Sequence, residues 1–400
     1  MHLSNHRLPA KVFFLCLLIL PMIGTSISAR AMSESSIKEQ IVGKTVTFYH
    51  NKKDKQIVRY FDPNGTFVQT DDEGEFRHGS WAIDDGQLCL APKGGSAKCR
   101  KFIKKKGKYG TANKKGKKIV SEIESSIEGN QVKIPEGAMA SKSRVSIKEE
   151  LVTLDTRKNV TETFLLVEPA GTPKGIVLLI PGHEGVVRFK KIGESYVVEN
   201  EGGGLPAHEK SRKILGKKGF VVAVIAPPSD RKPGMDTAFR RSDEHATDVG
   251  AVIAYLNKRY NEKVNIWGHC RSTFSPPAIL AHNGSNGVAG MILTSTRSTG
   301  KQGSVMETKG PRVAVPTLLV HHTEDPCDGT PYSNVGKLVS YYRESAPDVK
   351  LISVSGGNGD RDGKTYGCSG GHHAFKGQRG DVVKAVVQWL EHKPVPEQID

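Results

Sequence analysis

The second half of the chain alternates short apolar runs with amphipathic segments, and this pattern restricts the fold more than any other feature. Runs typical of buried strands occur at residues 163–168, 175–181, 220–226, 264–267, 290–294, 317–321 and 350–355. Segments with helical periodicity lie between them, at residues 207–218, 243–259, 275–283, 333–345 and 381–392. Strands that alternate with helices favour an α/β fold, a mostly parallel, doubly wound sheet. We expect functional residues in the loops at the carboxyl ends of its strands.

One of these loops has the spacing of a nucleophile elbow. A predicted strand ends at Trp267, a helix begins near Cys270, and the small residues Gly268 and Ser272 lie two positions before and two after the thiol. The strained central residue of an elbow leaves no room for large neighbours at these positions. A thiol at a helix N-terminus also tends to have a lowered pKa. The pattern fits a reactive cysteine, but it also fits a buried cysteine that only packs.

An acidic loop and a histidine loop follow the elbow along the chain. Asp325 and Asp328 come after the strand that ends at His321, and His372 and His373 come after the next strand. An open parallel sheet places nucleophile, acid and histidine at neighbouring strand ends in this order. Residues 146–392 therefore resemble an α/β-hydrolase, and they are most similar to exported members of the dienelactone hydrolase-like group.

The resemblance implies a catalytic triad. Cys270 would be the nucleophile, as in dienelactone hydrolases, whereas many exported relatives have serine at this position. The acid would be Asp325, with Asp328 as the alternative. The histidine of the family precedes an aromatic residue by two positions, which favours His373 over its neighbour His372.

Further roles follow from the same resemblance. An oxyanion hole needs two backbone N–H donors, one of them from the residue after the nucleophile. Arg271 would supply this donor, and His183, in the loop after an early strand, would supply the other. Arg240 and Arg241 match a family stretch before the helix that precedes the elbow. One of these two arginines is expected to steer a carboxylate of the substrate.

The N-terminus has the three-part order of a secretory signal peptide. Arg7 and Lys11 precede an apolar run at residues 12–23, and small residues follow up to Ala31. The run is shorter than the roughly 20 residues that a membrane-spanning helix needs. We expect a cleaved signal at residues 1–31 and an exported protein, periplasmic or secreted, in an oxidising compartment.

Five cysteines remain in the mature chain, so at least one is expected to be unpaired. Cys89 and Cys99 flank a turn-rich stretch and are predicted to pair. The resemblance places Cys327 just after the acid and Cys368 shortly before the histidine, so we expect a second disulfide to join these two loops. Cys270 then remains as the free thiol.

The hydrophobic pattern of residues 38–103 differs from that of the rest of the chain. Short alternating runs separated by turn signals predict a small antiparallel β domain there. Between Lys98 and Ser121 there are eleven basic residues and no acidic ones, which accounts for most of the net charge of +16. A Lys/Gly-rich run of this kind predicts a basic linker at residues 104–145, followed by a catalytic domain at 146–395. The alternative is that this run contacts an anionic envelope surface.

Several functional classes find no support in the sequence. Residues 358–369 match half of a calcium loop, but Ser369 stands where the loop requires glutamate. No metal or cofactor is expected, and the basic residues lack the interleaved aromatics of a nucleic-acid surface. Oligomeric state is left open. We expect an enzyme that cleaves a carboxylic ester, lactone or thioester of a small molecule; the alternative is an inactive hydrolase-fold protein that binds the envelope.

Overall fold

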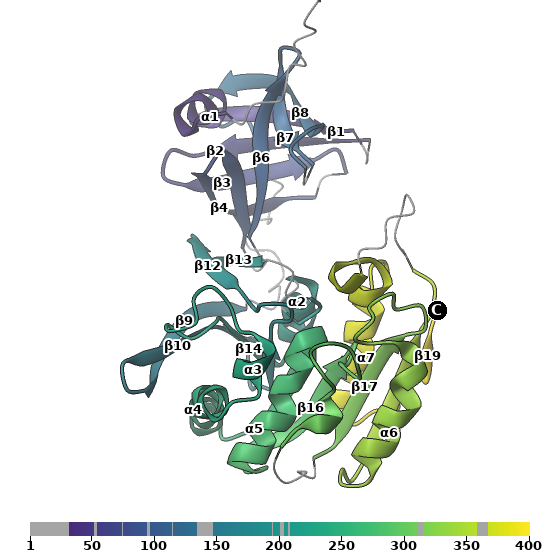
Figure 1. Ribbon diagram of the computed structural model, residues 1–400. Coiled ribbons are helices and arrows are strands. Elements are labelled where there is room, and N and C mark those ends of the chain that lie inside the picture. The colour runs from purple at the N-terminus through teal and green to yellow at the C-terminus, as the bar shows by residue number, and fades with distance from the viewer. Residues whose placement is uncertain are drawn as a thin grey trace, which may run out of the picture.

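The computed structural model describes residues 32–400, apart from 52–53, 74, 94–96, 114, 134–146, 194, 201–203, 207–208, 310–314 and 358–366. The described chain forms an N-terminal barrel and a C-terminal layered part built on a large sheet (Figure 1). The predicted signal peptide at residues 1–31 and most of the calcium-like loop lie outside the described residues. None of the helices found in the described segments combines the length and apolar character needed to span a membrane.

The N-terminal part is a closed antiparallel barrel, to which the described residues contribute eight strands. Each strand pairs with the next, and the last pairs back with the first. A short helix, α1 (Glu34–Ile41), buries Ile37 and Ile41 in the same apolar cluster as Phe61 and Phe102. The strands are β1 (Lys44–His50), β2 (Lys55–Phe61), β3 (Thr66–Asp71), β4 (Arg77–Asp84), β5 (Gln87–Pro92), β6 (Lys98–Lys105), β7 (Lys108–Ala112) and β8 (Ile119–Glu128).

The barrel corrects the prediction of a basic linker at residues 104–145. The end of β6 and all of β7 and β8 lie within that range, so the basic run belongs to the barrel wall. The wall is anchored by a few apolar side chains, among them Ile103, Ala112 and Ile119, which form a small buried cluster. Most of the intervening lysines are exposed. A strand with a solvated face can therefore carry many lysines, and composition alone does not separate it from a linker.

The C-terminal part is a mixed sheet, which has nine strands in the described chain, in the order β19-β18-β17-β16-β15-β11-β14-β10-β9. Only β10 runs antiparallel to its neighbours; the other pairings are parallel. The strands of this sheet are β9 (Lys148–Arg157), β10 (Val160–Glu168), β11 (Ile176–Ile180), β14 (Val221–Ile225), β15 (Val264–His269), β16 (Val288–Thr294), β17 (Thr317–His322), β18 (Val349–Val354) and β19 (Gln398–Ile399).

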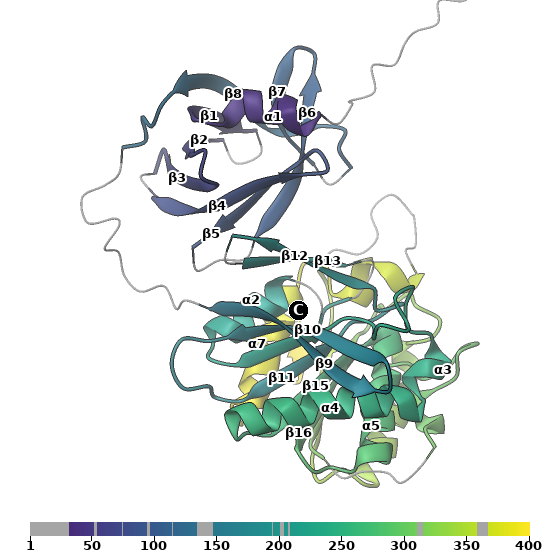
Figure 2. The ribbon, with the colours of Figure 1, turned by 90° about the vertical axis from the view of Figure 1, so that its left-hand side faces the viewer.

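Helices cover both faces of this sheet, as the alternating pattern predicts (Figures 1 and 2). On one face, α4, α5 and α6 share an apolar cluster with alternate residues of the strands, such as Leu178 and Ile266. On the other face, α2 and α7 pack on the intervening residues, such as Leu179 and Trp267. The helices are α2 (Glu209–Lys217), α3 (Thr237–Arg240), α4 (Asp243–Tyr260), α5 (Ser275–Asn283), α6 (Val335–Arg343) and α7 (Arg379–Leu390).

Local sequence explains where these elements lie. All five residues of β11 and of β14 are buried, which accounts for their unbroken apolar runs and is typical of central parallel strands. Helix α4 begins after Ser242, whose side chain accepts a hydrogen bond from the His245 N–H. It ends at Asn261, which adopts the left-handed conformation common at helix ends.

A hairpin that the sequence did not predict lies between the barrel and the sheet (Figure 2). It consists of β12 (Val187–Ile192) and β13 (Ser195–Asn200). Ile192 is buried in one cluster with Cys89, Ala91 and Ala97 of the barrel. The hairpin also forms an ion pair with the barrel, through Lys190 and Asp84. It therefore connects the barrel directly to the loop that follows β11.

Candidate active site

The turn after β15 has the geometry of a nucleophile elbow. Cys270 adopts a left-handed conformation with φ of +52°, which is strained for a side chain of this kind. A Cβ atom on Gly268 would lie 2.7 Å from the Ser272 carbonyl oxygen, so only glycine fits there. The Ser272 hydroxyl accepts a hydrogen bond from the His269 N–H at 2.7 Å and donates to the Ile180 carbonyl at 2.8 Å. The elbow is thus fastened to the end of β11.

The two predicted oxyanion donors belong to the elbow and to the loop after β11. The Arg271 N–H is close enough to the Cys270 sulfur to help lower the pKa of the thiol, which places this donor near the thiol. His183 lies in the loop after β11 and adopts a φ of +53°. The Arg271 guanidinium pairs with Glu184, the next residue in that loop. The elbow and the loop are therefore held together by side chains as well as by the sheet.

Arg240 is one of the two arginines expected to bind a substrate carboxylate, but its position in the structure does not fit this role. Its side chain is fully buried. Its Nη2 donates to the carbonyl oxygens of Pro181 and His183, at 2.8 and 3.3 Å. The guanidinium thus fixes the predicted oxyanion loop through its backbone carbonyl groups. Arg241 is only partly buried and donates to the Ser304 carbonyl at 2.7 Å, so its expected role in binding substrate stays a prediction.

The structure brings His373 and Asp325 together beside the thiol. His373 Nδ1 lies 3.0 Å from both carboxylate oxygens of Asp325, and both side chains are fully buried. A ring nitrogen of His373 and the Cys270 sulfur lie within 4.8 Å of each other. His373 Nε2 is buried and has no hydrogen-bond partner among the described residues. The three groups thus have the relative placement of a catalytic triad, with Nε2 left for the thiol and a substrate.

Both predicted disulfides are present. Cys89 and Cys99 face each other across β5 and β6. Cys327 and Cys368 join the loop after β17 to the loop after β18, which are the loops of Asp325 and His373. Cys270 is a free, buried cysteine.

Electrostatics favours a thiolate–imidazolium pair. Burial raises the pKa of the Cys270 thiol, but the charge and contact of His373, the charge of Arg297 and the Arg271 N–H together lower it. Burial likewise lowers the pKa of His373, but the thiolate and the Asp325 carboxylate outweigh this and raise it. Opposite shifts of two adjacent groups stabilise the charged form of each. A low thiol pKa is the property that makes a cysteine nucleophilic near neutral pH.

Three residues that the sequence did not single out support this arrangement. The Thr330 hydroxyl donates to Asp325 Oδ2 at 2.8 Å, and the Ser295 hydroxyl donates to the His373 carbonyl at 2.9 Å. Arg297 is buried beside the thiol, with Nη1 4.0 Å from the Cys327 sulfur. Ser295 and Arg297 directly follow β16, the strand between those of the nucleophile and the acid. Their position at that strand end is the one signal that could have identified them.

The alternative acid and histidine lie elsewhere. Asp328 is exposed. The His372 ring stacks on His322 with 4.1 Å between ring centroids, and its Nδ1 lies 3.3 Å from the Glu324 carbonyl oxygen. These contacts point His372 away from the pairing that His373 makes. His373 and Asp325 are therefore the better candidates on geometry.

Two clusters in the described chain have the ligand types of a metal site, but each includes one residue whose donor atoms are already engaged. One contains Cys270, His373 and Cys327, whose sulfur is bonded to Cys368. The other contains His322, Glu324 and His372. His322 uses both ring nitrogens, since Nδ1 accepts from the Glu324 N–H and Nε2 lies 3.0 Å from the Gly356 carbonyl.

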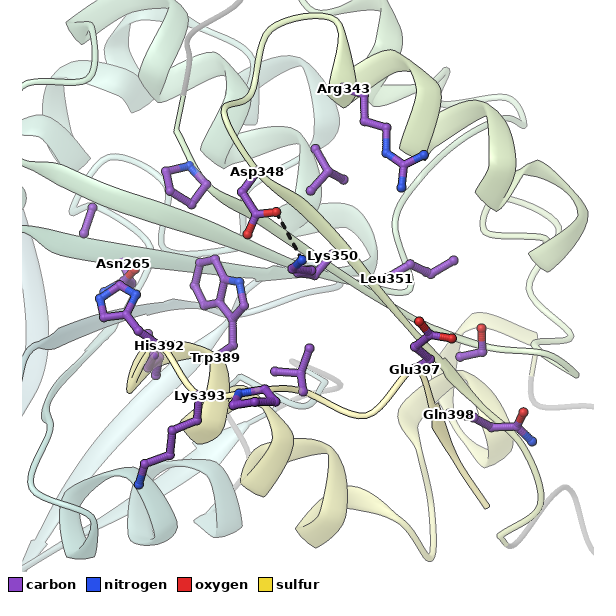
Figure 3. A pocket seen from close by; sticks show the side chains of 17 residues that line it. Asn265, Arg343, Asp348, Lys350, Leu351, Trp389, His392, Lys393, Glu397 and Gln398 are labelled. Atoms are coloured by element: carbon purple, nitrogen blue, oxygen red, sulfur yellow. Dashed lines mark ion pairs between the residues drawn. The ribbon is translucent and has the colours of Figure 1, made fainter.

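A large pocket of about 920 Å³ lies far from these residues (Figure 3). Asn265 and Val349 stand at the amino ends of β15 and β18, so this pocket is at the opposite edge of the sheet from the elbow. Asp348 and Lys350 form an ion pair in it, and Trp389 lies beside them. Parallel sheets bind their ligands at the carboxyl ends of the strands, whereas this pocket lies at the amino ends. The volume of the pocket therefore does not identify it as the active site.

Comparison with solved structures finds distant structural likenesses. No family model and no curated protein sequence matches the chain. The structure is similar to an alpha-beta serine hydrolase homologue from Coxiella burnetii, with a TM-score of 0.40 and 14% identity, covering 60% of this chain and 97% of that one. It is also similar to a cold-adapted esterase from an Arctic intertidal metagenomic library, with a TM-score of 0.37 and 17% identity, covering 54% and 86%.

A third likeness is to the esterase Pf2001 of Pyrococcus furiosus, with a TM-score of 0.44 and 11% identity, covering 62% of this chain and 92% of that one. Likenesses this distant do not establish the reaction of this chain.

Proposed function

We propose that this chain is an exported hydrolase of the dienelactone hydrolase-like group that cleaves small carboxylic esters, lactones or thioesters through Cys270, His373 and Asp325. The observation that carries the proposal is the convergence of a strained thiol, a histidine and a buried carboxylate at the ends of neighbouring strands. A structural cysteine would not need the left-handed elbow, the lowered pKa or the exclusion of a side chain at Gly268.

The first half of the reaction would acylate the thiol. The Cys270 thiolate adds to the substrate carbonyl carbon, and the carbonyl oxygen becomes an oxyanion that accepts hydrogen bonds from the N–H groups of Arg271 and His183. The bond to the leaving group then breaks, and His373 gives its Nε2 proton to the departing alkoxide or thiolate. Asp325 keeps the other ring proton on Nδ1 throughout. The products of this half are an acyl-enzyme and an alcohol or thiol.

The second half would release the acid. Neutral His373 accepts a proton from a water molecule as the water oxygen adds to the thioester carbonyl. The carbon–sulfur bond breaks, which restores the thiolate and the imidazolium together. For a lactone, the alcohol formed in the first half remains attached, so the product is a single hydroxy acid.

Export is part of the proposal, and the disulfides support it. Both are of the kind that persists in oxidising compartments and is rare in the cytosol. Cell fractionation, with the N-terminus of the exported protein determined by mass spectrometry, tests this part. Recovery of full-length protein in the cytosol would contradict it.

The test of activity is the release of nitrophenol from short-chain nitrophenyl esters by the purified protein. We expect turnover in the wild type, and an acyl group on Cys270 when the reaction is quenched early and analysed by mass spectrometry. The Cys270→Ala variant should lack both while retaining the same circular dichroism spectrum. Failure of the wild type over a panel of esters, lactones and thioesters would instead favour the alternative of an inactive protein that binds the envelope.

A further inference from the structure

The barrel encloses a cavity that the proposed reaction does not use. It has a volume of about 490 Å³ and lies between the barrel strands, with Lys213 and Lys217 of α2 also in its lining. Apolar side chains line part of it, including Phe48, Phe67 and Leu88. This volume is within the range of small-molecule sites. Eight-stranded barrels are also wide enough to hold one small ligand.

A buried cation lies in this cavity without a carboxylate partner. Arg59 is 8% exposed and faces Gln69 across β2 and β3. Its Nε and Nη2 both donate to Gln69 Oε1, at 2.9 and 2.6 Å. Its guanidinium carbon also lies 5.4 Å from the Phe48 ring centroid and 5.5 Å from that of Phe67. Among the described residues, no Asp or Glu forms an ion pair with Arg59.

Such an arrangement is costly without a counter-ion. Taking a charge out of water is repaid only where an opposite charge or a full set of hydrogen bonds compensates it. Burial and the nearby charge of Arg77 lower the pKa of Arg59 to about 9, which reflects this cost. One amide oxygen and the faces of aromatic rings compensate it only in part. The barrel therefore holds a positive charge that a bound anion would stabilise.

The other charged residues that line the cavity are also positive. No Asp or Glu in the described chain lines the cavity, whereas cations surround it. These are Arg77, Lys93, Lys98, Arg100, Lys213 and Lys217. Arg77 is paired with Glu75 at the rim, and the other lining cations are exposed or half-buried, so Arg59 is the buried cation that a ligand would satisfy. Low-dielectric walls lined by one sign of charge concentrate ions of the opposite sign.

We propose that the barrel binds a small amphiphilic anion, whose carboxylate, phosphate or sulfate group is held by Arg59 and whose apolar part packs against Phe48 and Phe67. The site is separate from Cys270, and the proposal does not depend on the reaction assigned to that residue. Gln69 occupies Nε and Nη2 of the buried guanidinium, which leaves Nη1 to donate to an oxyanion, and the ring faces beside it suit an alkyl chain.

The test is isothermal titration calorimetry of the mature full-length protein with octanoate and with octanamide. These probes have the same chain and differ in charge, and octyl sulfate tests whether another anionic head group is accepted. We expect octanoate and octyl sulfate to bind at least tenfold more tightly than octanamide. The Cys270→Ala variant should bind octanoate as the wild type does, which separates the barrel from the active site.

Two substitutions place the site within the barrel. Arg59→Met should weaken octanoate binding at least tenfold without lowering the melting temperature of the ligand-free protein. Gln69→Glu should also abolish binding, but raise the melting temperature, because it supplies the missing carboxylate inside the barrel. Lys101→Met is the matched control, since Lys101 is exposed on β6 and does not line the cavity.

Three results would overturn the proposal. They are equal affinity for octanoate and octanamide, unchanged octanoate binding in Gln69→Glu, and a loss in Lys101→Met as large as that in Arg59→Met. The Gln69→Glu variant keeps the test valid if Arg59→Met fails to fold.

Discussion

His373 Nδ1 lies 3.0 Å from each carboxylate oxygen of Asp325, in a pair that solvent does not reach. A ring nitrogen placed between two acceptors holds its proton there, so the proton on Nε2 is the one available for transfer. Thr330 and the Cys327 N–H donate to the same carboxylate, at 2.8 and 3.0 Å. Together with the bond to His373, they outweigh the effect of burial and lower the pKa of Asp325. Asp325 therefore stays ionised beside the imidazolium.

Replacing Asp325 by asparagine should remove the charge that keeps His373 protonated and correctly oriented. By analogy with triads in other folds, we expect kcat for a nitrophenyl ester to fall by about 10⁴-fold. Asp328→Asn is the control, because Asp328 is exposed, and its kcat should stay within about twofold of the wild type. Similar losses in both variants would reject Asp325 as the acid of the triad.

Alkylation by iodoacetamide should report the state of the thiol directly. Because His373 and Arg297 lower the pKa of Cys270, thiolate and alkylation should persist below the ordinary thiol pKa of about 8.5. The rate should decline only as the pH falls through the lowered value. His373→Gln should shift this inflection upward, since the largest favourable contribution is removed. An inflection at the ordinary value in the wild type would show that no ion pair forms.

The pairing of Cys270 with His373 also predicts how activity changes with pH on the alkaline side. The raised pKa of His373 means that its imidazolium is fully present near neutrality and is lost only as the pH rises through that value. Esterolysis with a poor leaving group, which needs the proton, should therefore decline at alkaline pH. Activity toward a nitrophenyl ester, whose leaving group needs no proton, should decline less. Identical alkaline limbs for the two substrates would argue against His373 as the general acid.

Removal of either disulfide should lower the stability of the protein, but removal of only one of them should also lower its activity. Cys327 and Cys368 are 41 residues apart, and loss of their bond should destabilise the protein by about 4 kcal/mol on chain-entropy grounds. Cys89 and Cys99 are 10 residues apart, and loss of their bond should cost about 3 kcal/mol. Only the Cys327→Ala/Cys368→Ala variant should also lower kcat, by about tenfold, because its loops carry Asp325 and His373. Urea unfolding and steady-state kinetics measure both effects, and unchanged kcat in this variant would contradict the second.

Arg240 should act as a positioning residue. The Arg240→Lys variant keeps a positive charge but loses Nη2, which donates to the carbonyls of both Pro181 and His183. We expect kcat to fall at least tenfold, with KM nearly unchanged, because the oxyanion loop would be less well placed. Arg241→Lys should affect KM for acidic esters more than kcat, if Arg241 binds a substrate carboxylate. Equal effects of Arg240→Lys on kcat and KM would argue against positioning.

The sheet and the order of the site residues could be predicted because burial leaves a strong trace in sequence. Central strands such as β11 and β14 are buried on both faces and are therefore unbroken apolar runs. The predicted helix at residues 275–283 coincides with α5, which has prolines in its first turn and ends before Gly284. The elbow was visible because its geometry excludes large residues at Gly268.

Features that depend on distant partners could not be predicted. Arg240 looks like any arginine in a loop, and only the fold brings the carbonyls of Pro181 and His183 to its guanidinium. Strands β7 and β8 carry so many polar residues that their pairing, not their composition, defines them. The hairpin of β12 and β13 is short and half-buried, so its alternation is weak. Thr330 and Ser295 act through isolated side-chain hydrogen bonds, which leave no pattern in the sequence.

The hairpin between the barrel and the sheet affects how the two parts of the chain would behave as separate fragments. Ile192 is 2% exposed and shares a buried cluster with Cys89, Ala91 and Ala97 of the barrel. A hydrolase fragment that begins after the barrel would expose this isoleucine to water, and a barrel fragment would expose the side chains that pack against it. Uncovered apolar patches of this kind promote self-association. The barrel and the hairpin therefore cover each other's apolar side chains, and exchange of either part between proteins would require new contact residues on both sides.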